Sequence, residues 1–85
     1  MTTTLFRAPV ADDRAHLLGQ LSPREWEVLS LMAEGRSNLA ISEQLTIELK
    51  TVETHVSRVF TKLGLDEDRY ENRRVRAVLI LVSPS

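Results

Sequence analysis

Apolar residues recur at helical spacing through the middle of the chain and predict two well-defined helices. In the first, over about 23–34, Trp26, Leu29 and Ala33 repeat at intervals of three and four residues. The second, over about 49–63, carries one apolar stripe at the spacing i, i+4, i+7, i+8 and i+11. The residues of this stripe are Val52, Val56, Val59, Phe60 and Leu63. Both helices are therefore expected to bury one face in a common core.

Start and stop signals frame these helices. Ser22-Pro23-Arg24-Glu25 has the spacing of a capping box, in which a serine and a glutamate satisfy each other's backbone N–H groups. Gly35 is expected to end the first helix in the left-handed conformation, and Gly64 to end the long one. A short helix over about 38–45 is predicted between the two.

The two ends of the chain are less regular. Residues 1–9 have no periodicity and are expected to be a mobile terminus, whereas 10–19 have the pattern of a short helix. A polar loop is predicted over 66–72 and a last helix over 73–82. This helix has two apolar stripes. One is expected to complete the core: Val75, Val78, Leu79 and Val82. The other is expected to be left for a second subunit: Ala77, Ile80 and Leu81.

Length and composition limit the classes of protein that fit. Eighty-five residues suffice for one small domain, and no apolar run approaches the roughly 20 residues of a membrane span. The start of the chain lacks a signal-peptide layout and cysteine is absent, which favours a cytoplasmic protein. Because so small a chain rarely holds a deep substrate pocket, we expect no enzyme. The predicted fold is all-α, a four-helix, bundle-like domain with room for a short extra N-terminal helix.

The net charge of −1 gives no overall indication of a nucleic-acid partner, but the charge is unevenly distributed. The segment 50–65 contains Lys50, Arg58 and Lys62 against Glu53 alone. A short helix, a tight turn and a longer helix with a small polar outer face are typical of a helix-turn-helix. Short side chains let such a helix enter a DNA major groove about 12 Å wide, and long cationic ones reach phosphates. The alternative is a solvated outer face on an ordinary helical bundle.

Four segments, in order and in register, resemble the LuxR-type DNA-binding domain, also called the NarL/FixJ type. They are LSPREWEVL at 21–29, EGRSN at 34–38, KTVETHV at 50–56 and KLG at 62–64. The resemblance covers about 18–82. It implies a four-helix, helix-turn-helix domain of a transcription regulator, whose third helix enters the major groove and whose fourth helix pairs two subunits.

The resemblance also implies roles for residues of the third helix. Lys50 would reach a phosphate or a base edge, and Thr51 would bond a phosphate. Val52 matches a position on the DNA side, although the periodicity places it at the edge of the buried stripe, so both roles stay open. Thr54 and His55 match the family's threonine and histidine. The short and basic side chains on the outer side of the same helix are added to these matches. The expected DNA-binding residues are then Lys50, Thr51, Val52, Thr54, His55, Ser57, Arg58 and Lys62.

Several positions depart from the family pattern. Glu48 stands where a serine usually caps the third helix, and glutamate is a poorer cap although its charge suits a helix N-terminus. Leu39 and Ala40 replace a lysine-glutamate pair, and the loop 66–72 is longer than usual. Glu53 replaces a frequent lysine, which predicts weaker non-specific binding or a hydrogen bond to a cytosine amino group.

Other residue types that often carry chemistry do not form a site. His16 and His55 fall on different elements without clustered carboxylates, so no metal site is expected. The glycines are isolated helix stops, and the acidic residues 66–68 lack the glycine and distal glutamate of a calcium loop. Trp26 is expected in the core. No catalytic residue and no cofactor are expected.

The sequence thus predicts sequence-specific binding of duplex DNA by the output domain of a transcription regulator. We expect an N-terminal tail or linker over 1–17, the DNA-binding domain over 18–82 with its helix-turn-helix at about 37–56, and a C-terminal tail over 83–85. A receiver or ligand-binding domain would need about 100 further residues. The chain is therefore expected to be either the output end of a longer regulator or a small free-standing one.

The expected partners follow from this interpretation. They are duplex DNA with an inverted-repeat operator, a second copy of the chain on that DNA, and RNA polymerase as a further candidate; no membrane is involved, and the bound protein would lie in the nucleoid. The alternative is a protein-interaction module of the same fold with little or no DNA affinity. The pI near 6.1, Glu53 in the groove-facing helix and the two apolar faces of the last helix favour that alternative.

Overall fold

The computed structural model describes residues 11–65 and 69–82, with side chains from Arg14 onward, and these residues form five helices and no strand. The predicted all-α fold is thereby confirmed. Expectations for 1–9, 66–68 and 83–85 fall outside the described residues. In chain order the helices are α1 (Ala11–Gly19), α2 (Pro23–Ala33), α3 (Asn38–Leu45), α4 (Leu49–Lys62) and α5 (Tyr70–Val82).

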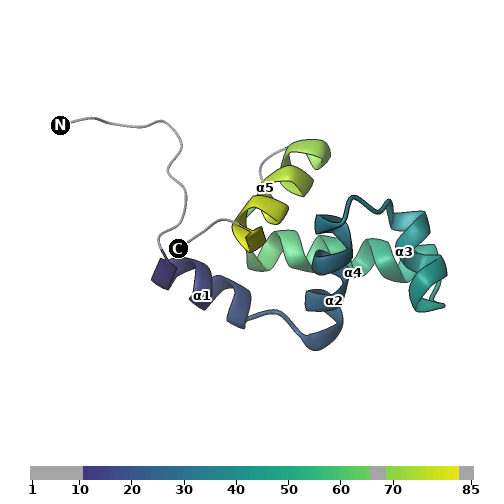
Figure 1. Cartoon of the computed structure of the whole chain (residues 1–85), viewed down its shortest axis with the longest axis horizontal. Helices are drawn as coiled ribbons and strands as arrows, with labels where there is room; N and C mark the ends of the chain where they lie inside the picture. Colours follow the sequence, from purple (N-terminus) through teal and green to yellow (C-terminus); the bar gives the residue numbers. More distant parts are fainter. Residues whose placement is uncertain (1–10, 66–68, 83–85) are drawn as a thin grey trace.

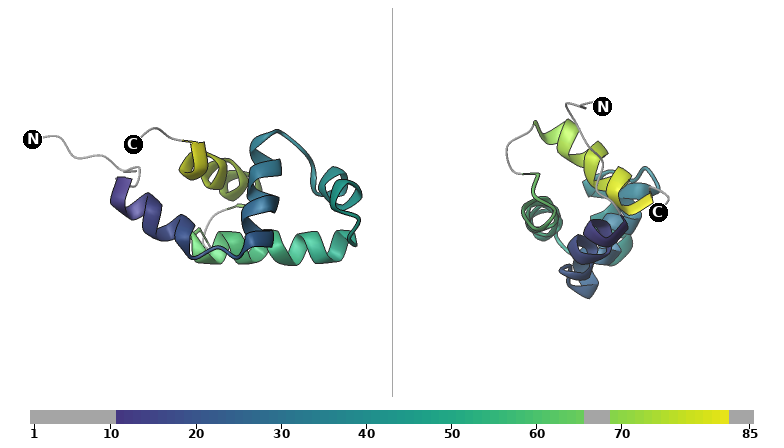
Figure 2. Two further views of the ribbon diagram at one scale, coloured as in Figure 1. Left: turned by 60° about the horizontal axis from the view of Figure 1, so that its bottom comes forward. Right: turned by 90° about the vertical axis from the view of Figure 1, so that its left-hand side faces the viewer.

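The longest helix, α4, packs against α2 and α3, whereas α5 packs mainly on α2 and α1 lies against α5 (Figure 1). α2 crosses α4 near its middle, α3 lies over one end of it, and α5 and α1 lie toward the other (Figure 2). All four stand on the same side of α4 in the left-hand view of Figure 2. Among the described residues, no helix covers the opposite side of α4. No helix in the described part of the chain is long and apolar enough to cross a membrane.

Hydrogen bonds at the helix ends explain where α2 and α3 begin and end. Ser22 Oγ accepts from the N–H of Glu25 at 3.1 Å, and Glu25 Oε1 accepts from the N–H of Ser22 at 2.9 Å, which confirms the capping box. Gly35 follows with a φ of +85°. Ser37 Oγ then caps α3 by accepting from the N–H of Ala40 at 3.1 Å. These contacts are local in sequence, so sequence alone could predict them.

The turn between α3 and α4 is made by Thr46, which takes a left-handed conformation with a φ of +57°. Glu48 precedes α4 and makes no side-chain capping hydrogen bond, as expected for a poor cap. At the other end, the N–H of Leu65 donates to the carbonyl of Phe60 at 2.8 Å, with Gly64 at a φ of +75°. This is the Schellman arrangement that the sequence indicated.

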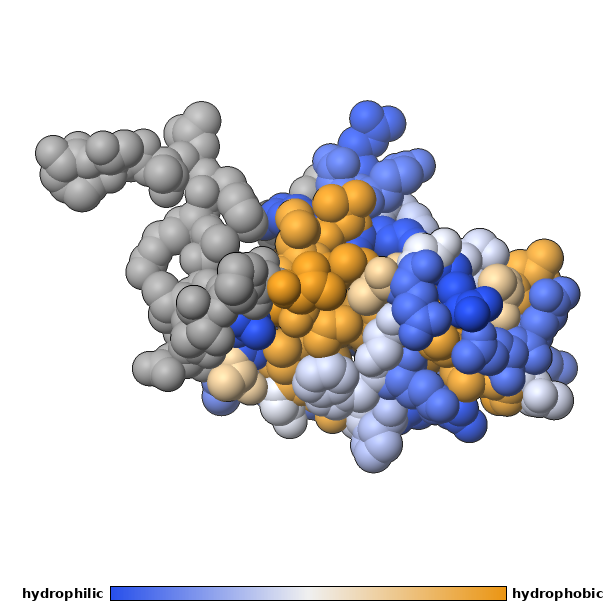
Figure 3. Space-filling model, in the orientation of Figure 1, coloured by the Kyte–Doolittle hydropathy of each residue, from blue (hydrophilic) through white to orange (hydrophobic). Residues whose placement is uncertain are grey.

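The last helix packs with the opposite face from the one predicted. α5 begins at Tyr70, three residues earlier than expected, and turns Ala77 and Ile80 into the core, where they are 0% and 6% exposed. Leu81 also packs against the core. Of the face expected to be buried, Val78 is half-buried against the core, but the other three residues are exposed: Val75 by 58%, Leu79 by 49% and Val82 by 55%. Figure 3 shows apolar surface over α5. The physical reason is close approach: a small residue, Ala77, lets α5 lie near its neighbours.

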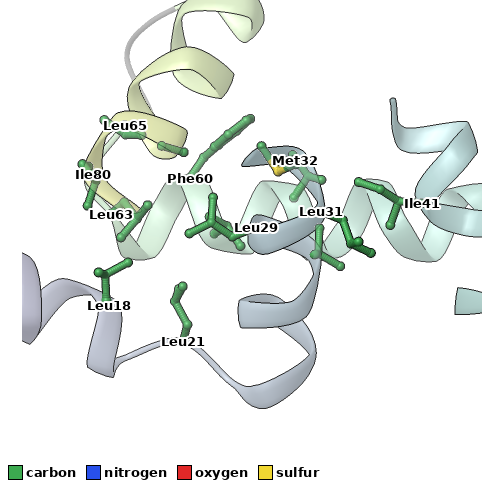
Figure 4. Close-up of a cluster of buried hydrophobic side chains, with 14 of the residues drawn as sticks. Leu18, Leu21, Leu29, Leu31, Met32, Ile41, Phe60, Leu63, Leu65 and Ile80 are labelled. Carbon is green, nitrogen blue, oxygen red and sulfur yellow. The ribbon is translucent and has the colours of Figure 1, made fainter. Parts of the chain in front are cut away.

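The core lies between α2 and α4 and is completed by residues from every other helix (Figure 4). The predicted stripe of α4 is buried throughout, with Val52, Val59 and Phe60 at most 1% exposed. Leu18 from α1 lies in this core beside Leu63 and Ile80. Trp26 is not a core residue, because it is 37% exposed. A continuous core of this kind holds α4 rigidly while leaving its outer face free.

Candidate nucleic-acid interface

The outer face of α4 consists of polar side chains opposite its buried stripe. At 100° per residue, the positions between the stripe residues return to one side of the helix. Lys50, Thr54, Ser57 and Arg58 are exposed on the side opposite the stripe, and the exposed Glu53 lies on its flank; we call these five residues the outer face. No other helix of the described chain covers this side of α4 (Figure 2). A single protruding helix of this shape fits a groove better than a pocket.

The side chains of the outer face differ in reach. Thr54 and Ser57 are short, and Thr54 Oγ1 folds back to donate to the carbonyl of Lys50 at 3.1 Å. They let the backbone of α4 come close to a flat or grooved partner. Lys50 and Arg58 are long, exposed cations. They lie one and nine residues after Leu49, the first residue of α4. Two cations that flank short polar side chains suit a partner whose charged backbone borders a groove.

Three of the predicted DNA-binding residues are not part of the exposed outer face. Val52 is 0% exposed, so its side chain belongs to the core and cannot contact DNA, which resolves the two roles left open by the sequence. His55 is half-buried, and its Nδ1 is enclosed without a hydrogen-bond partner among the described residues. Thr51 is half-buried in the first turn of α4. The periodicity of the helix was the better guide at Val52 than the family pattern.

Lys62 makes a contact within the fold that the sequence did not predict. Its Nζ donates to Glu25 Oε1 at 2.7 Å, and this carboxylate is only 3% exposed. The pair joins the end of α4 to the capping box of α2. Because the two partners are 37 residues apart, periodicity could not reveal the contact. Lys62 is therefore paired within the fold, and with its side chain 35% exposed its contact with DNA stays a prediction. Lys50 and Arg58 are the exposed cations of the outer face.

The environment of Glu25 favours its charged form. Burial alone would raise the pKa of this carboxyl, but the hydrogen bonds from Lys62 and Ser22 outweigh burial and lower the pKa below 4.5. A carboxyl whose pKa is lower in the folded state than in the unfolded chain stabilises the fold above the unfolded pKa. That stabilisation is lost as the pH falls below about 4.5.

We expect Glu25→Gln to lower the free energy of unfolding by about 1–3 kcal/mol at neutral pH, because the charged hydrogen bond to Lys62 is replaced by a neutral one. Glutamine can still accept from the N–H of Ser22, so the cap survives. The deficit should shrink as the pH is lowered through 4.5 and below. Urea unfolding at several pH values measures it. Glu27→Gln, on an exposed carboxylate of the same helix, is the control; equal deficits in the two variants would contradict the role given to Glu25.

A second exposed feature lies on α5. The side chains of Val75, Val78 and Leu79, with Met32 of α2 and Arg74, line a shallow, mostly apolar hollow of about 260 Å³. The residues predicted for a subunit interface, Ala77, Ile80 and Leu81, are instead part of the core. An apolar surface on a short terminal helix is more typical of a docking face than of a solvated one.

Clusters of metal-ligating side chains are considered among the described residues alone. No group of three or more His, Cys, Asp or Glu is placed to hold a metal ion in this part of the chain. His16 is exposed on α1, far in sequence from His55. What the structure does present is the outer face of α4 and the apolar face of α5.

The sequence of the chain is similar to those of known regulatory proteins. A family model described as "Bacterial regulatory proteins, luxR family" matches residues 19–70. The transcriptional regulatory protein LiaR of Bacillus subtilis (strain 168) is 45% identical over 47 residues, which are 55% of this chain and 22% of that protein. The oxygen regulatory protein NreC of Staphylococcus aureus (strain JH9) is 51% identical over 45 residues, 53% of this chain and 21% of that protein. No solved structure matches the chain. The matched segment thus spans about a fifth of the length of these two relatives.

Proposed function

Because the chain belongs to the luxR family of bacterial regulatory proteins, we propose that it binds duplex DNA sequence-specifically as the output domain of a transcription regulator. The observation that carries this proposal is the outer face of α4, which is polar, exposed and backed by a continuous core. The helix α3, the turn at Thr46 and α4 then form the helix-turn-helix. The proposed place of action is the cytoplasm, at the nucleoid.

In the proposed complex, α4 enters the major groove with its outer face toward the bases. Thr54 and Ser57 are short enough to allow the approach, and Lys50 and Arg58 neutralise phosphates on either side. Glu53 lies among them, where a carboxylate accepts a hydrogen bond from a cytosine amino group. It also repels phosphates, so we expect non-specific binding to be modest.

We further propose that two copies pair through the exposed face of α5, made of Val75, Leu79 and Val82. This replaces the stripe that the sequence suggested. A two-fold pair places two recognition helices about one DNA turn, or roughly 34 Å, apart and so reads an inverted repeat. RNA polymerase stays a candidate partner with no assigned surface.

Salt dependence tests the proposal directly. The affinity for duplex DNA should fall steeply with salt, and Lys50→Ala and Arg58→Ala should each weaken binding roughly tenfold and flatten the salt slope by about one. Neither residue is buried, so thermal unfolding should be unchanged. Fluorescence anisotropy with a labelled duplex at several salt concentrations gives both quantities.

Arg36→Ala is the matched control, because it removes the same charge from the turn between α2 and α3, which lies away from the outer face (Figure 2). It should bind DNA like the wild type. A wild-type chain with no better affinity at low salt than an unrelated acidic protein would instead support the interaction-module alternative.

A further inference from the structure

Three side chains connect the start of α5 to the start of α3. Asn38 Nδ2 donates to the hydroxyl oxygen of Tyr70 at 2.7 Å, and Arg74 Nη1 donates to Asn38 Oδ1 at 2.8 Å. A guanidinium has only donors, so it must face the amide oxygen, which leaves the amide nitrogen for Tyr70. We call these three residues the α3–α5 latch. The partners are 32 and 36 residues apart, so sequence periodicity gave no sign of it.

The latch also holds the backbone in front of α3. Arg74 Nη2 donates to the carbonyl oxygen of Arg36, which directly precedes the cap residue Ser37. One guanidinium thus binds the turn and the first residue of α3 together. The planar fork of arginine supplies two such donors in a fixed geometry, which the single ammonium of lysine does not.

The other side of the latch is fixed to the core. The ring of Tyr70 meets Phe60 edge-on, with ring centroids 5.6 Å apart and an angle of 77° between the planes. The guanidinium carbon of Arg73 lies 5.1 Å from the centroid of the Phe60 ring. Phe60 belongs to α4 and is 1% exposed. The latch therefore ties the start of α3 to the same core that holds the recognition helix.

These hydrogen bonds matter for the position of α3, because this helix is short and has little packing to hold it in place. It has only eight residues, packs on α4 and to a lesser extent on α2, and ends in a left-handed turn. The packing of α5 is mainly against α2, and to a lesser extent against α4 and α1. Isolated helices of this length are not stable, so the orientation of α3 depends on its contacts.

We propose that Arg74 is a positioning residue for DNA binding, which holds α3 at the angle to α4 that a specific complex requires. This inference rests on the proposed DNA-binding function. Arg74 also lines the apolar hollow beside Val75 and Leu79, so it sits between the proposed dimer face and the helix-turn-helix. A specific complex needs both helices in register with the duplex, whereas non-specific binding needs only the charges of α4.

Arg74→Lys and Arg74→Met separate positioning from charge. Affinities for a preferred operator, selected from random duplexes, and for random DNA of equal length are measured over a series of salt concentrations. Both variants should lose about tenfold in affinity for the operator, with affinity for random DNA and the salt slope unchanged. Arg36→Ala keeps the carbonyl that Arg74 binds and should retain the preference of the wild type.

Other outcomes would overturn the inference. If Arg74→Lys matches the wild type while Arg74→Met loses affinity for both DNAs with a smaller slope, Arg74 acts as a plain positive charge. If both variants match a wild type that prefers its operator, Arg74 has no role in binding. A wild type that prefers no operator would overturn the proposed function and, with it, the role of Arg74.

Hydrogen exchange tests the latch without DNA. In Arg74→Lys, and in Asn38→Ala, the amides of α3 should exchange several-fold faster, while those in the middle of α4 keep the rates of the wild type. Unchanged exchange in α3 would show that the latch does not hold this helix and would overturn the inference. Faster exchange throughout the domain would point to general destabilisation and would also count against a positioning role.

Discussion

Val56→Asp is expected to unfold the domain. Val56 lies in the middle of α4 and is 1% exposed, so the new carboxylate would be buried without a partner. Burial of an unpaired charge costs several kcal/mol, and a chain of this length is stable by only about 4–13 kcal/mol. Far-UV circular dichroism should show the loss of most of the helical signal at room temperature.

The adjacent residue provides the matched control. Ser57→Asp adds the same charge one position further along α4, but on the exposed outer face. It should stay folded, within about 0.5 kcal/mol of the wild type, and lose DNA affinity because the carboxylate faces phosphates. A Val56→Asp chain with the melting temperature of the wild type would mean that the core has been assigned incorrectly.

The parts of the fold that sequence could predict are those decided locally. The capping box at Ser22 and Glu25, the cap at Ser37 and the left-handed glycines all depend on residues within one helical turn. The buried stripe of α4 was equally clear, because all of its apolar residues fall on one face. The polar outer face of α4 could be predicted from the same helical spacing, because it lies on the other side of the helix from this stripe.

The face of α5 that is buried could not be predicted in this way. Both faces are apolar, and the choice between them is made by contacts with residues distant in sequence. Tyr70 and Arg73 pack against the ring of Phe60 of α4, and Ala77 is buried on the face of α5 that meets the core. The number of large apolar residues favoured the face with Val75 and Leu79. That number takes no account of how closely a small residue such as Ala77 lets two helices approach.

The roles of individual site residues divide in the same way. Those that depend on helical spacing could be predicted from the sequence, and those that depend on contacts between distant segments could not. Val52 was assigned to DNA by family resemblance and to the core by periodicity, and burial decides for the core. Lys62 has the position of a phosphate contact but is held by Glu25, and the latch around Arg74 depends on partners in α3. Ion pairs and hydrogen bonds between distant segments leave no periodic signal in a sequence.

The exposed face of α5 gives the second large expected effect. Val75→Glu combined with Leu79→Glu should leave the monomer folded, because both side chains are about half-exposed. It should abolish pairing, since burial of each large apolar side chain contributes about 1.5–3 kcal/mol before the cost of association. Binding to a two-half-site operator should fall by at least about a hundredfold, while weak binding to one half-site persists. Gel shifts with the two duplexes measure this difference.

Ile80→Glu is the control for that pair of substitutions. It places the same side chain one residue after Leu79, but at a position only 6% exposed, and should unfold the domain rather than merely separate the subunits. If Ile80→Glu stayed folded and lost the operator, pairing would run through the stripe first inferred from the sequence. If the Val75→Glu and Leu79→Glu chain bound both half-sites like the wild type, the copies would meet through another surface, and the hollow beside Met32 would not be part of the interface.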